Sequence, residues 1–149
     1  MSAEVPWAAL ISVDKVMELR DVGIKRYGGM KHRGDPEDCV DGALGAAWHA
    51  AVFRSEEEDA DKRLQFAGFL LFYLATKQCF SEGNKRAAWA SAMWVLASKQ
   101  LTVRATVDEA VGLMNEAIAK KVDGDRCVIW LSERIDVAGD SGAGLFPAT

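Results

Sequence analysis

The chain has 149 residues, half of them hydrophobic, which is enough for one domain with its own core. A formal net charge of -4 and a sequence pI near 5.2 argue against a general nucleic-acid binder, which would present a basic face. The N-terminal segment has no basic leader, and the longest apolar stretch, residues 66–75, is shorter than the about 20 residues that span a bilayer. We therefore expect a cytoplasmic protein with no membrane partner and no direct nucleic-acid binding.

Apolar residues recur at three- and four-residue spacing far more often than they alternate, and this pattern predicts helices rather than strands. The sequence therefore predicts an all-α fold, a single-domain bundle of about six helices. The domain is expected over residues 1–137. A flexible C-terminal tail, rich in glycine and alanine, is expected over residues 138–149.

The first three helices are expected between Ser12 and Lys77. The first is expected from an N-cap at Ser12 to the glycine pair at positions 28 and 29. The second should begin at Pro36 and continue to about Phe53. The third, about Asp59–Lys77, is apolar nearly all round in its middle, which predicts the central element of the bundle.

Three further helices are expected over about residues 84–99, 106–121 and 124–135. The first of these carries many small residues, which let another helix approach closely. Thr106 and Glu109 have the spacing of a capping box at the start of the next. Trp89 and Trp94 are five positions apart and so lie on different helix faces, which predicts that at least one of them is partly exposed.

The three cysteines, Cys39, Cys79 and Cys127, are odd in number and widely spaced within apolar helical patterns. We expect buried thiols in a reducing compartment rather than disulfides.

The segment Gln78–Arg86 is a short loop that runs straight into the expected fourth helix. The free N–H groups and the positive end of the dipole at a helix N-terminus attract phosphate, and Gly83 lets the backbone come close. Phe80 is expected to anchor the loop in the core, and Glu82 is placed where a magnesium ion could bridge it to phosphates. Further donors and charges come from three successive residues, Asn84, Lys85 and Arg86. The loop is therefore a candidate nucleotide site.

This loop resembles the signature of the Fic/Doc (death-on-curing) family, histidine-x-Phe-x-acid-x-Asn-Lys/Gly-Arg. Five positions match it, namely Phe80, Glu82, Asn84, Lys85 and Arg86. Further stretches similar to the family are residues 26–29, 41–44, 108–111 and 130–131. The resemblance covers roughly Ile11 to Ile135.

The resemblance implies a small helical protein that uses ATP, or another nucleotide, and magnesium to modify a hydroxyl of a target protein. Most members transfer AMP, whereas Doc toxins transfer a phosphate to a translation elongation factor. Lys85 matches the Doc form of the motif, and Ala90 stands where the AMP-transferring branch commonly has a second arginine. By resemblance, Glu82 would hold the metal, Asn84 and Arg86 the phosphates, and Lys85 the nucleotide. The family's inhibitory Ser/Thr-x-x-x-Glu-Gly/Asn segment has no match, so a separate antitoxin is the expected restraint on a toxin.

The chain departs from the signature at its histidine, whose position is taken by Gln78. An amide cannot accept the proton of the target hydroxyl, and a general base is worth about 10²–10⁴ in rate. Three interpretations stay open: a binding-only protein, an engineered loss of activity, or a different reaction on a phosphorylated or adenylylated small molecule. Of the two histidines, His49 is expected to be a packed helix residue, with a replacement base as the alternative, and His32 a solvated loop residue.

Overall fold

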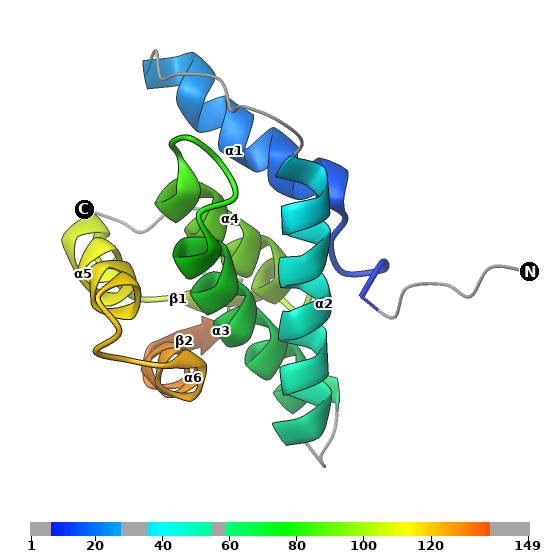
Figure 1. Ribbon diagram of the computed structural model, residues 1–149. Coiled ribbons are helices and arrows are strands. Elements are labelled where there is room, and N and C mark those ends of the chain that lie inside the picture. The colour runs from blue at the N-terminus through cyan, green and yellow to red at the C-terminus, as the bar shows by residue number, and fades with distance from the viewer. Residues whose placement is uncertain (1–6, 28–35, 55–58, 138–149) are drawn as a thin grey trace, which may run out of the picture.

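The computed structural model describes residues 7–27, 36–54 and 59–137, which form six helices and one small sheet (Figure 1). The helices are α1 (Val13–Tyr27), α2 (Pro36–Arg54), α3 (Asp59–Lys77), α4 (Asn84–Ala97), α5 (Val107–Ile118) and α6 (Gly124–Ser132). The strands are β1 (Leu101–Val103) and β2 (Ile135–Val137). The predicted all-α bundle is confirmed. His32, the glycine pair at 28 and 29, and the tail after residue 137 lie outside the described residues.

The bundle is built around α3, which contacts α2, α4, α5 and α6 (Figure 1). Phe66, Leu70 and Leu71 on α3 are fully buried, as the apolar middle of this helix predicts. No described helix is both long enough and apolar enough to cross a membrane.

Helix α4 is the second core element because its small residues allow a close approach to α3. Ala87, Ala88 and Ala92 are completely buried. Trp89 is buried, whereas Trp94 is 36% exposed and carries the Lys15 ammonium 4.2 Å from its ring centroid. The expected division of the two tryptophans between faces is confirmed.

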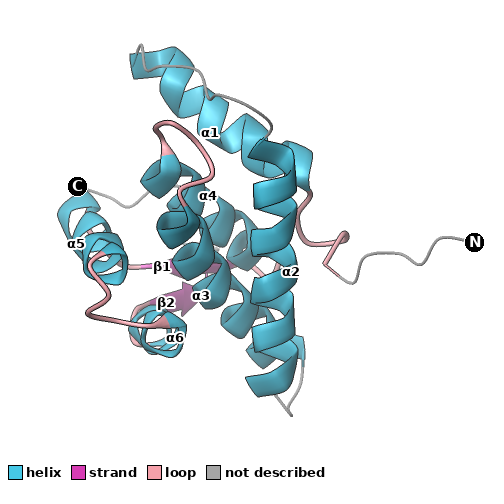
Figure 2. Ribbon diagram, viewed as in Figure 1, coloured by secondary structure: helices cyan, strands magenta, loops and turns pink. Residues whose placement is uncertain are grey.

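A two-stranded antiparallel sheet joins the ends of α4 and α6 and was not predicted (Figure 2). Leu101 pairs with Val137, and Val103 pairs with Ile135. Helix α6 therefore ends at Ser132, before the predicted end at Ile135, because the chain is drawn into this pairing. Each strand has three residues, too few for an alternating pattern to stand out in the sequence.

The contact between α3 and α6 depends on Gly68. A Cβ atom at this position would lie 2.8 Å from the Val128 Cα atom and would also collide with the Val128 side chain. Gly68→Ala is expected to lower the free energy of unfolding by about 1–3 kcal/mol, because overpacking outweighs the better helix propensity of alanine. Urea unfolding monitored by circular dichroism measures this change.

Gly42 on α2 provides the matched control, since a Cβ there meets nothing within 4 Å. Gly42→Ala should raise stability by about 0.4–1 kcal/mol. An equal gain from both substitutions would contradict the close packing of α3 against α6.

Candidate functional site

The loop between α3 and α4 turns through two residues in the left-handed backbone region. Gln78 follows the last residue of α3 with φ 55°, and Gly83 forms the N-cap of α4 with φ 85° and ψ 11°. Glycine adopts this conformation at little cost, whereas glutamine does so only when its surroundings stabilise it. Phe80 lies between them, 5% exposed, and anchors the loop in the core as predicted.

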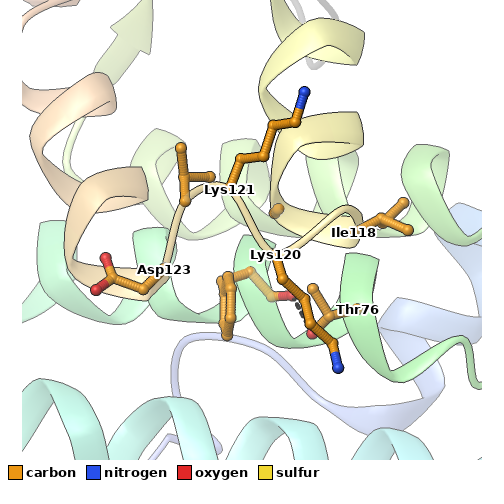
Figure 3. Close-up of a pocket in the computed structure, with 8 residues that line it drawn as sticks. Thr76, Ile118, Lys120, Lys121 and Asp123 are labelled. Atoms are coloured by element: carbon orange, nitrogen blue, oxygen red, sulfur yellow. Dashed lines mark hydrogen bonds between the residues drawn. The ribbon is translucent and has the colours of Figure 1, made fainter.

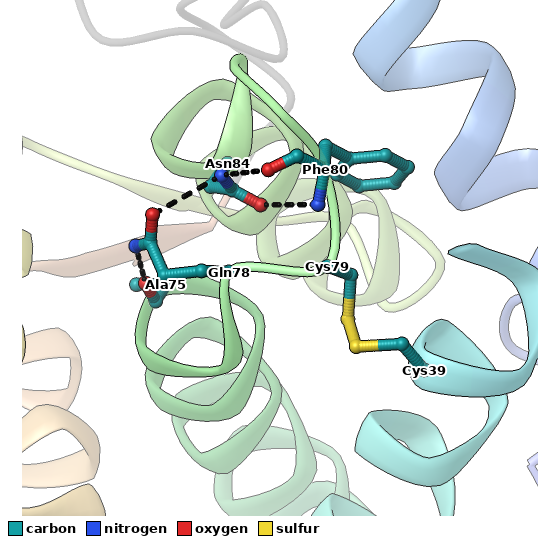
Figure 4. Close-up of a disulfide and its surroundings, with 6 residues drawn as sticks. All are labelled: Cys39, Ala75, Gln78, Cys79, Phe80 and Asn84. Carbon is teal, nitrogen blue, oxygen red and sulfur yellow. Dashed lines mark hydrogen bonds between the residues drawn. A yellow bond between two sulfur atoms is a disulfide. The ribbon is translucent and has the colours of Figure 1, made fainter. Parts of the chain in front are cut away.

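The Asn84 side chain stabilises the loop through hydrogen bonds with its backbone (Figure 4). Its Oδ1 accepts a hydrogen bond from the Phe80 N–H at 3.0 Å, and its Nδ2 donates to the Phe80 carbonyl at 2.9 Å. The Asn84 residue is 6% exposed. These contacts give Asn84 a structural role in shaping the loop, which the sequence did not suggest, and its phosphate contact stays a prediction.

Gln78 is fixed in the same network despite its exposure. Its Nε2 donates to the Ala75 carbonyl at 2.6 Å, and its Oε1 accepts from Asn84 Nδ2 at 3.3 Å (Figure 4). The side-chain amide therefore bridges the end of α3 and the start of α4. These two hydrogen bonds offset the cost of the left-handed backbone at this position.

A buried arginine on α1 supports the loop from the core side. Arg20 is 1% exposed, and its Nε donates to the Glu82 carbonyl at 3.1 Å. Its guanidinium carbon lies 5.1 Å from the Phe80 ring centroid. Arg20 was not predicted from the sequence, although its position one helical turn after the buried Val16 places a charge on the apolar face of α1.

The charged residues of the motif lie around the first turn of α4. The Lys85 Nζ donates to Asn115 Oδ1 on α5 at 2.9 Å. Glu82 and Arg86 are both partly exposed, so water and solutes reach them. The structure thus gathers Glu82, Gly83, Lys85 and Arg86 at one helix end.

The N-terminus of α4 differs from those of its neighbours. Thr106 caps α5 by accepting from the Glu109 N–H at 3.1 Å, and Asp123 caps α6 by accepting from the Arg126 N–H at 2.9 Å. Helix α4 has no side-chain cap and no acidic residue in its first turn. Its first turn instead carries Lys85 and Arg86, so both the helix dipole and the side chains favour an external anion there.

A disulfide ties the loop to α2, contrary to the prediction of free thiols. Cys79 in the loop is bonded to Cys39 near the start of α2, with Cα atoms 5.5 Å apart (Figure 4). Wide sequence spacing does not reveal that two helix ends meet, and this is why the pair was missed. Cys127 is a buried free thiol as expected, and burial raises its pKa to about 12.

A cavity of about 550 Å³ lies beside the last turns of α3 and α5 (Figure 3). Its apolar surface comes from residues that include Phe72, Ala117 and Val122. The ammonium groups of Lys120 and Lys121 extend to opposite sides of the connection between α5 and α6 (Figure 3). Thr76, on its wall, is two residues before Gln78. The cavity is therefore a neighbour of the loop along α3.

Other candidate groups do not join this site. His49 is exposed on α2 rather than packed, because the buried face of this helix is formed by residues such as Leu44, Ala47 and Ala51. Among the described residues, no three His, Cys, Asp or Glu side chains gather to hold a metal ion.

No protein-family model matches the chain, and no curated protein is significantly similar to it.

Proposed function

We propose that this chain is a Doc-like nucleotide-binding protein of the Fic type. It binds ATP, or another nucleotide, by its phosphates and transfers a phosphate or AMP to a hydroxyl of a target protein. The observation that carries this proposal is the N-terminus of α4, which has no side-chain cap and no acidic residue while Lys85 and Arg86 stand in its first turn.

The phosphates approach the Gly83 end of α4, where the missing side chain leaves room for close contact with the backbone. Arg86 supplies a planar fork of donors, and Lys85 supplies a point charge whose direction is set by Asn115. A magnesium ion, when bound, neutralises phosphate charge. Since the described residues form no cluster of three metal ligands, Glu82 would hold the ion together with phosphate oxygens.

The protein partner follows from the same resemblance. A translation elongation factor is the proposed target, and a separate antitoxin is the proposed restraint. This target makes the cytoplasm the proposed location, whose reducing conditions oppose the Cys39–Cys79 disulfide. Gln78 lacks the basic nitrogen of the family's histidine, so any transfer by this chain proceeds slowly.

A second candidate is a binding module that holds a nucleotide and transfers nothing. The two hydrogen bonds of the Gln78 amide favour it, because they show a side chain placed to brace the loop. Hydrolysis or rearrangement of a nucleotide without any protein target would instead indicate different chemistry on a small molecule.

Calorimetric titration with ATP and magnesium tests the binding step. We expect Arg86→Gln to weaken binding about 10- to 100-fold, because it removes a charge-assisted contact with phosphate. The exposed Arg126 on α6 supplies the control, and Arg126→Gln should leave the affinity unchanged. Equal affinities for all three proteins, or no binding by any, would refute a phosphate site at this loop.

A further inference from the structure

One charged residue that contacts the candidate site, Arg20, is given no role by the resemblance to the Fic/Doc family. Arg20 comes from α1, and its guanidinium lies between the loop and the core with 1% exposure. Besides the Glu82 carbonyl, it contacts Asp21, whose Oδ1 accepts from Arg20 NH1 at 3.1 Å. The Asp21 side chain is 57% exposed, so water weakens the neutralising effect of this carboxylate.

Burying a guanidinium is costly unless its donors are hydrogen-bonded and its charge is paired. Methionine or leucine would fill the same space on the apolar face of α1 without that cost. The hydrogen bond from Arg20 Nε to the Glu82 carbonyl therefore gives this buried guanidinium a contact in the loop itself.

The contacted carbonyl belongs to the peptide that joins Glu82 to Gly83. In a trans peptide the C=O and the following N–H point in opposite directions within one plane. A hydrogen bond that holds the Glu82 oxygen toward Arg20 consequently turns the Gly83 N–H away from Arg20. This N–H immediately precedes the first turn of α4, where the proposed phosphates bind.

We propose that Arg20 is a positioning residue for the anion site. It fixes the Glu82–Gly83 peptide so that the Gly83 N–H faces the bound phosphate. The assignment rests on the proposed function for its ligand, but the orientation of the peptide can be tested without any ligand.

Two variants and one control test this assignment. Arg20→Met keeps the volume and removes both charge and donors, whereas Arg20→Lys keeps the charge and loses the planar fork. Val16→Ala, one turn earlier on α1, creates a cavity at a fully buried position and controls for general loss of stability.

The first readout is amide hydrogen exchange at Gly83 in the nucleotide-free protein, followed by NMR. We expect faster exchange or a clear shift of this resonance in Arg20→Met and Arg20→Lys, and neither in Val16→Ala. An unchanged Gly83 amide in both Arg20 variants would overturn the positioning role. A change of equal size in Val16→Ala would mean that the effect on the Gly83 amide arises from core packing, and it would overturn that role as well.

The second readout is the affinity for magnesium-bound ATP and for inorganic pyrophosphate. Arg20→Met should weaken both about 10- to 100-fold, with Arg20→Lys intermediate and Val16→Ala unchanged. A changed Gly83 amide together with no binding by the original chain would refute the proposed function and leave the peptide orientation established. Full affinity in Arg20→Met would overturn the role of Arg20 in binding.

Discussion

Replacing Cys39 and Cys79 with serine is expected to lower the free energy of unfolding by about 4 kcal/mol. The disulfide joins residues 40 positions apart, and in the chain-entropy account a cross-link of this span restricts the unfolded chain by about that amount. Urea unfolding of the oxidised protein and of the double variant measures the difference. Adding a thiol reductant to the original chain should reproduce the shift.

Cys127 offers the control for this experiment. Cys127→Ala leaves the disulfide in place, so its unfolding should stay sensitive to reductant. In the native oxidised protein no cysteine should react with an alkylating agent at pH 8, because Cys39 and Cys79 are bonded and the Cys127 thiol, with its pKa raised to about 12, is buried. Alkylation of Cys39 and Cys79 in the folded protein would contradict the cross-link.

Gln78→His is expected to raise the rate of transfer from ATP to the target about 10²- to 10⁴-fold, with little change in nucleotide affinity. The substitution supplies a nitrogen that can accept the proton of the target hydroxyl. The imidazole replaces the two hydrogen bonds of the Gln78 amide, and its place beside the loop is set by the left-handed backbone at position 78, a conformation that histidine adopts more often than most residues. Transfer of radiolabelled γ-phosphate, or of an α-labelled AMP group, to a purified elongation factor measures the rate and the group transferred.

Gln78→Ala is the control, because it removes the amide without supplying a base. It should bind the nucleotide, with some loss if the loop loosens, and should transfer no faster than the original chain. Binding without transfer by the histidine variant would leave the binding module as the function, since the missing base would then not be what limits the reaction.

The sequence was sufficient for the parts of the fold that depend on local patterns. Helix α3 begins and ends where the apolar run predicts, and the hydrogen bonds of Thr106 and Glu109 form the expected capping box. Ser12 likewise accepts from the Lys15 N–H at 3.0 Å, as its predicted role as N-cap requires. These features involve residues within a few positions of one another, and so their physics is visible in the sequence.

Three of the features that were missed depend on contacts between distant segments. Cys39 meets Cys79 because α2 packs against α3, and β1, which follows α4, pairs with β2, which follows α6. Arg20 is 62 positions from the carbonyl that it contacts. In the candidate site, the motif residues could be predicted from their spacing. The hydrogen bond from Arg20 to the loop, and those of Asn84 within the loop, could be recognised only in the folded structure.

The most direct test of the central claim is a titration of the isotopically labelled protein with magnesium-bound ATP, followed by the backbone amide resonances. Binding of phosphates at α4 predicts the largest shifts at Gly83, Lys85 and Arg86, reproduced by pyrophosphate and not by adenosine. Shifts confined to the cavity around Lys120 and Val122, or an unchanged spectrum, would contradict a phosphate site at this loop.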